Sequence, residues 1–350
     1  MTNAVSLAQG ASNNTTFRNR IINGGMVIDQ RNAGASVTPT SGQYLVDRFL
    51  TYVSQASKLT AQQNAGSVTP PVGFAKYLGF TSSSAYSITT SDYFMLLQKV
   101  EGFNISDLAW GTANAAPVTL SFWVRSSLTG TFGGSIRNPA ASASYPFSYT
   151  VSSANTWTAI NITISGPTIG SWSTDSTTGL EVDFGLGVGS TYSGTAGAWA
   201  AADYRSATGA TSVVGTSGAT FYITGVQLEK GTVATPFEQR LYGTELALCQ
   251  RYYWIVSGSN TPAGSGVSAS GTLTNVYVKH PVSMRSAPTF TQSSTVVNIG
   301  SASYTCTGIN NAYATFDTSL VQPTVSSGLS ATQGVTWLTN NGYVSASSEL

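Results

Sequence analysis

Short apolar and aromatic runs recur along residues 19–235, separated by Gly, Ser, Thr, Asn and Pro, and no helical periodicity accompanies them. In the run from Val118 to Arg125, every second residue is apolar. That period of two places the apolar side chains on one face of a β-strand. Further strands are expected at residues 75–80, 93–100, 145–151, 157–164 and 180–186. Many short strands with turn signals between them indicate a sandwich or barrel, and we interpret the region as a jelly-roll β-sandwich.

The stretch 19–32 holds a turn signal between two apolar pairs. Ile21-Ile22 and Met26-Val27 flank Asn23-Gly24-Gly25, a pattern that predicts a strand, a tight bend and another strand. We interpret it as the first strand of the sandwich. Residues 1–18 contain no core-forming pattern and predict an extended arm; a frayed terminus is the alternative.

Residues 236–252 contain the one short helix that we expect, placed as a linker between two β domains. Thr244 can cap its amino end, with Glu245 at the positive end of the helix dipole. Residues 253–350 again show alternating apolar runs. The predicted fold is therefore all-β: a jelly-roll β-sandwich over residues 19–235, a short linker helix, and a second, C-terminal β-sandwich domain.

Charged residues make up only 8% of the 350 residues, whereas soluble proteins carry about 25%. So few surface charges protect a monomer poorly against association, and we expect a homo-oligomer that buries part of this surface. The net charge of +1 gives no general attraction to nucleic acid. No apolar run approaches the ~20 residues of a membrane span, and no secretory pattern opens the chain. We expect synthesis in a cytoplasm, no membrane insertion, and two buried thiols at Cys249 and Cys306.

Several segments resemble a family of tailed-phage virion structural proteins, especially those of marine and cyanobacterial phages. They are Ile21 to Met26, Asp29 to Asn32, Tyr44 to Phe49, Phe221 to Glu238, and Tyr242 to Tyr253. Residues 280–288 also resemble a recurring piece of phage-fibre C-terminal domains. Family members are tail fibres or other virion proteins, with a core similar to jelly-roll carbohydrate-binding modules. The resemblance implies a location in the virion after synthesis in the host cytoplasm.

Three arginines make the arm and its junction with the sandwich basic: Arg18, Arg20 and Arg31. Within the family, such an arm would dock onto an acidic socket of another virion protein, in the tail, the baseplate or the capsid. We therefore expect these three side chains to take part in virion attachment.

Rings and amides on a neutral surface suit sugars, which present apolar ring faces and hydroxyl edges. Our candidate glycan-binding residues are Trp199, Tyr204, Trp337, Asn340, Asn341 and Tyr343. The first two lie in the Gly- and Ser-rich segment 187–218, which is too long for an ordinary connection. The others surround an expected turn at Asn340-Asn341-Gly342. The alternative for each ring is a place in the core.

The chain lacks the sequence motifs of common hydrolases, and we expect no enzyme activity. His280, the single histidine, precedes a proline and has no evident catalytic partner. Glu181 and Asp183 share a strand face, where a glycosidase would need two carboxylates about 5–9 Å apart. Exposure to solvent or pairing with arginines is the interpretation that we favour for them.

No cofactor is expected, with a structural Ca²⁺ as the one option left open. The oxygen ligands near the predicted sheet ends are Asp29, Glu101, Asp107 and Glu229. Ca²⁺ takes six or more oxygen ligands, and sequence spacing alone does not bring these four together.

We therefore expect a homotrimeric tail fibre that attaches through residues 1–18 and binds host-surface polysaccharide through its C-terminal domain. Three copies would combine weak contacts into firm adhesion through effective concentration. A capsid decoration, cement or head-fibre protein is the alternative. A glycan depolymerase is the third hypothesis.

Overall fold

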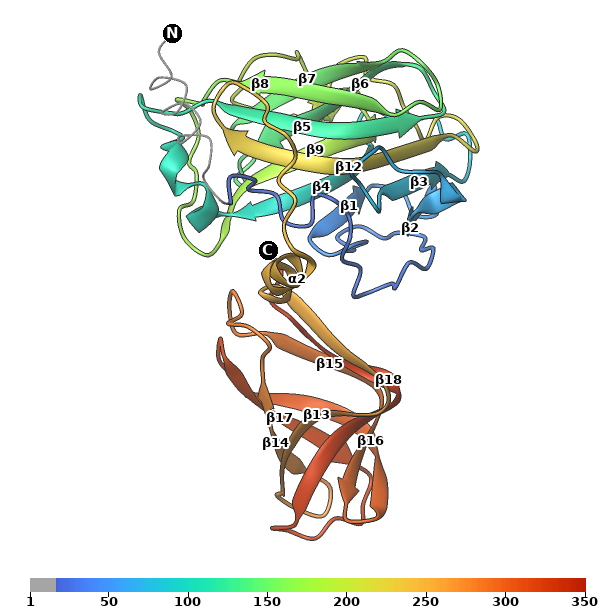
Figure 1. Cartoon of the computed structure of the whole chain (residues 1–350), viewed down its shortest axis with the longest axis vertical. Coiled ribbons are helices and arrows are strands. Elements are labelled where there is room, and N and C mark those ends of the chain that lie inside the picture. Colours follow the sequence, from blue (N-terminus) through green and yellow to red (C-terminus); the bar gives the residue numbers. More distant parts are fainter. Residues whose placement is uncertain (1–16) are drawn as a thin grey trace. The chain divides into compact units, whose positions relative to one another are not determined.

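The computed structural model describes residues 17–350, and the chain divides into two compact units, Met1–Arg240 and Leu241–Leu350 (Figure 1). The expected attachment arm, residues 1–18, lies outside the described residues except for Phe17 and Arg18. The prediction of a mostly β chain with one short helix is confirmed for the part of the chain that is described.

The first unit is a sandwich of two five-stranded sheets, in which all pairings are antiparallel. One sheet runs in the order β1 (Phe49–Val53), β4 (Tyr93–Glu101), β9 (Thr178–Val188), β6 (Gly130–Arg137) and β7 (Ser144–Val151). The other runs in the order β2 (Leu59–Gln63), β3 (Leu78–Ser82), β12 (Thr220–Lys230), β5 (Val118–Ser126) and β8 (Thr158–Ile164).

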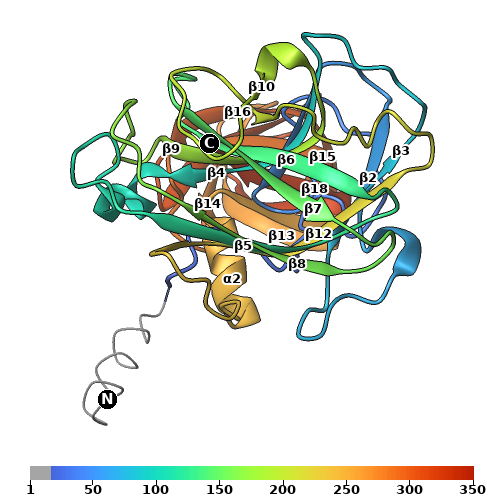
Figure 2. The ribbon, with the colours of Figure 1, turned by 90° about the horizontal axis from the view of Figure 1, so that it is seen from above.

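Short elements connect these strands. They are the 3₁₀ helices η1 (Ala65–Ser67), η2 (Gly102–Asn104), η3 (Ser106–Leu108) and η4 (Ser190–Tyr192), and the parallel pair β10 (Ser193–Gly194) and β11 (Ser206–Ala207). Figure 2 shows β10 on the side of β6 and β9 that faces away from β5 and β8. The segment around β10 and β11 therefore lies outside the sandwich.

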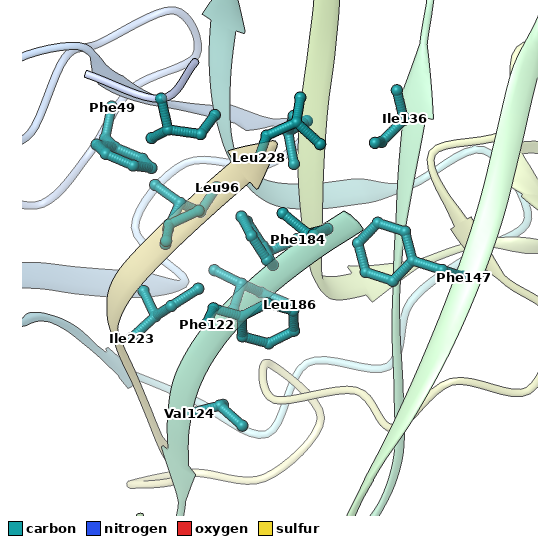
Figure 3. Close-up of a cluster of buried hydrophobic side chains, with 14 of the residues drawn as sticks. Phe49, Leu96, Phe122, Val124, Ile136, Phe147, Phe184, Leu186, Ile223 and Leu228 are labelled. Carbon is teal, nitrogen blue, oxygen red and sulfur yellow. The ribbon is translucent and has the colours of Figure 1, made fainter. Parts of the chain in front are cut away.

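Alternation along the strands turns one side of each sheet toward a shared core. On β5, the apolar residues Val118, Leu120, Phe122 and Val124 are at most 1% exposed. Phe122 meets Phe184 of the opposite sheet, with ring centroids 5.1 Å apart (Figure 3). The alternation predicted for this strand is confirmed, and such burial of large side chains is the main stabilising contribution to the sandwich.

The strand, bend and strand predicted for residues 19–32 are not formed, because the stretch consists of turns and bends. Asn23 lies at a φ of 60°, and its side chain hydrogen-bonds the backbone of Ile28 and Asp47. A side chain that satisfies backbone groups in this way replaces the ladder of a strand. Ile21 still reaches the core, where it is fully buried.

The second unit begins with the helix α2 (Tyr242–Gln250). Leu241 is its N-cap and makes no side-chain capping hydrogen bond, so the cap predicted at Thr244 is wrong. Thr244 instead lies inside the first turn, next to Glu245, which occupies the acidic position expected there.

Six antiparallel strands then close into a barrel. Their order is β13 (Tyr253–Ser268), β14 (Thr274–Lys279), β17 (Thr318–Val325), β16 (Ala302–Ala314), β15 (Thr289–Ile299) and β18 (Gly334–Ser347). The domain is all-β as predicted, but one closed sheet replaces the expected sandwich. Register shifts between β13 and β18 let both strands bend. Gly266 is required in β13, because a Cβ there would lie 1.8 Å from the Asn275 carbonyl oxygen.

Phe122→Ala should lower the free energy of unfolding of the first unit by about 3–5 kcal/mol, because it opens a cavity between the two sheets. Phe103→Ala is the matched control: Phe103 is 59% exposed, and we expect a change within about 0.5 kcal/mol. Denaturant unfolding followed by circular dichroism measures both. Equal losses in the two variants would contradict this assignment of the core.

Candidate binding face

The outward side of the sheet β1-β4-β9-β6-β7 carries a group of partly exposed tyrosines. We call Tyr44, Tyr52, Tyr93 and Tyr192 the tyrosine face. Three of them pack on a small second core of Leu50, Met95 and Leu97, each at most 2% exposed. These three rings thus rest on an apolar layer on the opposite side of the sheet from the main core.

Arg205 lies between two rings of the tyrosine face. Its guanidinium carbon is 4.7 Å from the ring centroid of Tyr93 and 4.7 Å from that of Tyr192. The two rings meet edge to face, with centroids 5.5 Å apart. A guanidinium held against two aromatic rings is favoured electrostatically by the negative faces of the rings.

Cationic side chains also lie against the rings of the other two tyrosines of the face. The Arg31 guanidinium carbon is 4.8 Å from the ring centroid of Tyr44, and Lys99 Nζ is 5.8 Å from that of Tyr52. Arg31 additionally forms an ion pair with the buried Asp47 at 2.9 Å. The face therefore combines aromatic rings with positively charged hydrogen-bond donors.

A cluster of five charged side chains adjoins this face. Arg137 of β6 forms ion pairs with Glu181, with Asp183 at 2.9 Å and with Asp203 at 3.3 Å. Arg205 binds the other oxygen of Asp203 at 2.9 Å. Glu181 and Asp183, considered above as a glycosidase pair, are 5% and 0% exposed. The arginine-paired alternative for these two carboxylates is therefore confirmed.

Three carboxylates face two guanidiniums in this cluster, so one negative charge is left over when all five groups are ionised. Burial raises the pKa of Asp183 to about 7, and the neighbouring Glu181 adds to this, while Arg137 opposes it. Burial alone would lower the pKa of Arg137, but Asp183 and Glu181 raise it above its usual value. Asp183 thus retains its proton to a higher pH than an ordinary carboxyl group does.

The cluster and two glycines hold residues 189–212 against the sheet. A Cβ at Gly133 would lie 2.5 Å from Ser206 Oγ, and one at Gly185 would lie 2.7 Å from the same atom. Only glycine at these two positions lets β11 approach the strands so closely. Asp203 and Arg205, in the same segment, are then fixed by their ion pairs.

The two glycan-binding candidates of this segment, Trp199 and Tyr204, do not belong to the tyrosine face, and Trp199 packs against the main core. Trp199 packs edge to face against Trp110, Trp172 and Tyr145, and its Nε1 donates to the Ser165 carbonyl at 2.7 Å. Its contacts are those of a packed side chain.

Tyr204, the second candidate in the segment, is partly exposed and stands against Gly194. A Cβ at Gly194 would lie 2.3 Å from the Tyr204 ring. The backbone nitrogen of Tyr204 also donates to Ser144 Oγ at 3.1 Å. The residue therefore helps to seat the segment on β7.

The four C-terminal candidates do not form the expected site. Asn340, Asn341 and Tyr343 lie within the continuous strand β18, so the predicted turn is absent there. Trp337 is fully buried in the barrel core, where it cannot offer a ring face to a sugar. Asn341 has a φ of 55° and marks an irregularity of the strand. A strand with a bulge at Asn341, which pairs with β13 and β15 before and after the bulge, has replaced the turn that the Asn-Asn-Gly signal predicts.

The three candidate residues for virion docking lie at two different places in the first unit. Arg18 and Arg20 line a pocket of about 420 Å³, while Arg31 belongs to the tyrosine face. Phe17, Asp107 and Lys230 complete the pocket lining. Arg20 and Lys230 pair with Asp107 at 2.8 and 3.4 Å. Three cations around one carboxylate leave the pocket positively charged.

The four carboxylates proposed for Ca²⁺ do not converge. Asp29 accepts backbone hydrogen bonds from Asn32 and Gly34, and Asp107 is held by cations. Glu229 accepts from Thr235 at 2.7 and 2.8 Å, and Glu101 is buried. Among the described residues, no group of three or more His, Cys, Asp or Glu side chains is arranged to hold a metal ion.

His280 packs in the barrel beside Trp254 and Phe290, with its Nε2 3.1 Å from Ser319 Oγ. Burial lowers its pKa. Cys249 is buried as predicted, whereas Cys306 is only partly buried. Within residues 17–350, no helix has the length and apolar character to span a membrane.

Sequence reasoning did not single out Tyr52 and Tyr93, although both lie in apolar runs. Alternation along β4 places Tyr93 on the side opposite Phe94, and this could be read from the sequence. The sequence does not show which side of this sheet packs against the other sheet. That choice depends on long-range pairing, as between Tyr52 and Met95 on β1 and β4.

No protein-family model matches the chain, and no curated protein does either. The resemblance to phage virion proteins by sequence therefore stays a prediction. Solved structures share a distant likeness with the chain. One is the enzymatically active domain of tailspike protein 4 from bacteriophage CBA120, which is 14% identical and covers 61% of this chain, with a TM-score of 0.32. The match spans only 22% of that chain.

Carbohydrate-binding modules show likeness of the same order. A family 61 module solved with β-1,4-galactotriose is 12% identical over 61% of this chain and 99% of its own, with a TM-score of 0.30. A family 11 module from Clostridium thermocellum, solved with a mixed-linked tetrasaccharide, is 12% identical over 58% of this chain and 99% of its own, with a TM-score of 0.30. At TM-scores below 0.5, these likenesses do not assign a function.

Asp183→Asn should change how stability depends on pH. The pKa of about 7 in the folded state exceeds the ordinary carboxyl value, so between about pH 4 and 7 the folded state binds the proton and the unfolded state does not. The free energy of unfolding of the wild type should therefore fall relative to the variant as pH rises, by up to about 1.4 kcal/mol per pH unit. Denaturant unfolding at pH 4.5 and 7.5 measures the difference.

Asp175→Asn is the control for this titration. Hydrogen bonds from Thr177 and Ser173 lower the pKa of Asp175 to about 2, so its titration lies below the tested window. A wild type that gains stability relative to Asp183→Asn between these pH values would contradict the prediction.

Proposed function

We propose that this chain is a non-enzymatic virion protein that binds a host-surface glycan through its tyrosine face. The observation that carries the proposal is the pair Tyr52 and Tyr93 on adjacent strands, with Lys99 and Arg205 against their rings. Tyrosine rings stack on the apolar faces of sugars, and ammonium or guanidinium groups donate to their hydroxyls. The tyrosine face offers both kinds of group together.

The support under the face favours binding of this kind. Tyr52 of β1 and Tyr93 of β4 stand on strands and pack on Leu50, Met95 and Leu97, which are buried. Side chains held on packed strands lose little conformational entropy when they bind, and positions on strands are better fixed than positions in loops.

The absence of catalysis is part of the proposal. Glycan cleavage needs one carboxyl group that can give a proton and a second that acts on the sugar or on water. Glu181 and Asp183 are instead both bound by Arg137 beneath the segment that carries Asp203. A carboxylate engaged in a buried ion pair is not placed to meet a substrate.

Virion attachment and trimer formation complete the proposal. The positively charged pocket lined by Arg18, Arg20 and Lys230 suits acidic side chains of another virion protein. The low charge content supports a homotrimer, because copies that cover one another reduce the weakly charged surface left in water. Three copies would multiply weak glycan contacts. A location in the virion rests on the family resemblance.

The double variant Tyr52→Ala with Tyr93→Ala should weaken binding to purified host-surface polysaccharide at least about tenfold, because each substitution removes a stacking surface. Tyr242→Ala, which removes a 64% exposed tyrosine from α2, is the control. Binding of the labelled protein to immobilised polysaccharide measures the effect, with circular dichroism to verify the fold. Unchanged affinity in the double variant would contradict the proposed site.

Lys230→Glu should reduce incorporation into particles, because it reverses one charge of the positively charged pocket. Lys279→Glu, at an exposed position on β14, is the matched control. Quantitative immunoblotting of purified particles measures incorporation, and immunogold labelling locates the protein. Labelling on the head would favour the decoration, cement or head-fibre alternative. Cleavage of the polysaccharide by the wild type, lost in a Glu181→Gln and Asp183→Asn variant, would favour the depolymerase.

A further inference from the structure

The barrel of the second unit presents two tyrosines that no function described above uses. Tyr277 of β14 and Tyr313 of β16 are 67% and 74% exposed. Both have the same register partner, Leu320 of β17, which lies between them. Register partners on antiparallel strands share a face, so these three side chains form one outward row across three strands.

A row of amides runs beside the row of rings. Gln322 Nε2 donates to Asn275 Oδ1 at 2.8 Å, and Asn310 is the register partner of Gln322 on the other side. On β14 and β17, the amide lies two residues along the strand from the residue of the ring row. On β16, which has a bulge, Asn310 lies three residues from Tyr313. We call the ring row and the amide row together the barrel face.

We propose that the barrel face is a second saccharide-binding site, built for a neutral, extended glycan chain. Adjacent strands lie about 4.8 Å apart, so the backbones that carry Tyr277 and Tyr313 are about 10 Å apart. In an extended glycan chain, that distance separates a pyranose ring from the next ring but one. Each tyrosine can then stack on one sugar, while the amide row donates to and accepts from hydroxyls along the edge.

The charge of the face decides the class of glycan. Lys279 is the one charged side chain of β14, β16 and β17, all of which are described. The tyrosine face of the first unit, by contrast, holds Arg31, Lys99 and Arg205 against its rings. A carboxylated or sulfated glycan would find few cations on the barrel face, whereas a neutral one needs none.

Two other occupants fit less well. A protein strand cannot extend this sheet, because the barrel is closed and has no free edge. A second copy of the chain would bury the amides Asn275, Gln322 and Asn310, which would then need matching partners to avoid an energetic cost. Hydroxyl-rich sugars supply such partners at every ring.

The test uses the full chain and isothermal titration calorimetry with four neutral hexasaccharides, built from glucose, galactose, mannose and N-acetylglucosamine. We expect the wild type to bind at least one of them. Tyr277→Ala with Tyr313→Ala should raise its Kd at least about tenfold. Tyr242→Ala is the matched control, because Tyr242 is a 64% exposed tyrosine of α2, outside the strands of the barrel face.

The double variant Tyr52→Ala with Tyr93→Ala should keep this binding, so a failure of the barrel face can be told apart from a failure of the tyrosine face. Only the choice of a saccharide as the ligand rests on the function proposed above. Binding of none of the four sugars by the wild type, or equal Kd values for wild type and the Tyr277/Tyr313 variant, would overturn the proposal. A smaller particle mass for that variant in sedimentation would overturn it as well, and would assign the face to contacts between copies.

Discussion

Packing of large apolar side chains on one side of each sheet decides which side chains the other side presents. On β4, Phe94 and Leu96 reach the shared core, so Tyr93 and Met95 must point outward. A slip of one residue would exchange the two sets and remove the tyrosine face. The barrel obeys the same rule, because the buried valines of β14 hold Tyr277 outward. Both candidate faces are therefore consequences of core packing, and any change that alters the core will also disturb them.

The five-charge cluster explains how a long connection stays in one place. Residues 189–212 have little regular structure, and a segment of this kind is normally mobile. Arg137, on a central strand, reaches Asp203 in the segment and two carboxylates on β9. Burying these charges is costly, so the cluster is not a source of stability in itself, but removing Arg137 would leave carboxylates unpaired. Its role is positional: it fixes Arg205 between Tyr93 and Tyr192.

Alternation and turn signals were enough to predict the strands around Val118 and Leu180, because local sequence decides them. The opening stretch failed for a physical reason, since the Asn23 side chain satisfies backbone groups that a strand would have paired. The sequence could not reveal the closure of the second domain into a barrel, which depends on register shifts between distant strands. It also favoured Trp337, a ring that the closed barrel buries completely. Exposure of a given aromatic residue is a property of tertiary packing and not of its neighbours in sequence.

The uneven distribution of charge links the two candidate faces. Residues 1–240 hold 23 of the 29 charged residues, and the second unit holds the remaining six. The sugar recognition that we propose for the first unit can therefore use cations against rings, while the site that we propose for the second unit must use rings with amides and hydroxyls. Contacts between cations and anionic groups of a glycan weaken as salt rises, whereas stacking and hydrogen bonds to neutral groups change little. Under these proposals, one chain with both kinds of face would stay bound to a glycan across changes in ionic strength. The salt dependence of binding should therefore differ between variants of the tyrosine face and variants of the barrel face.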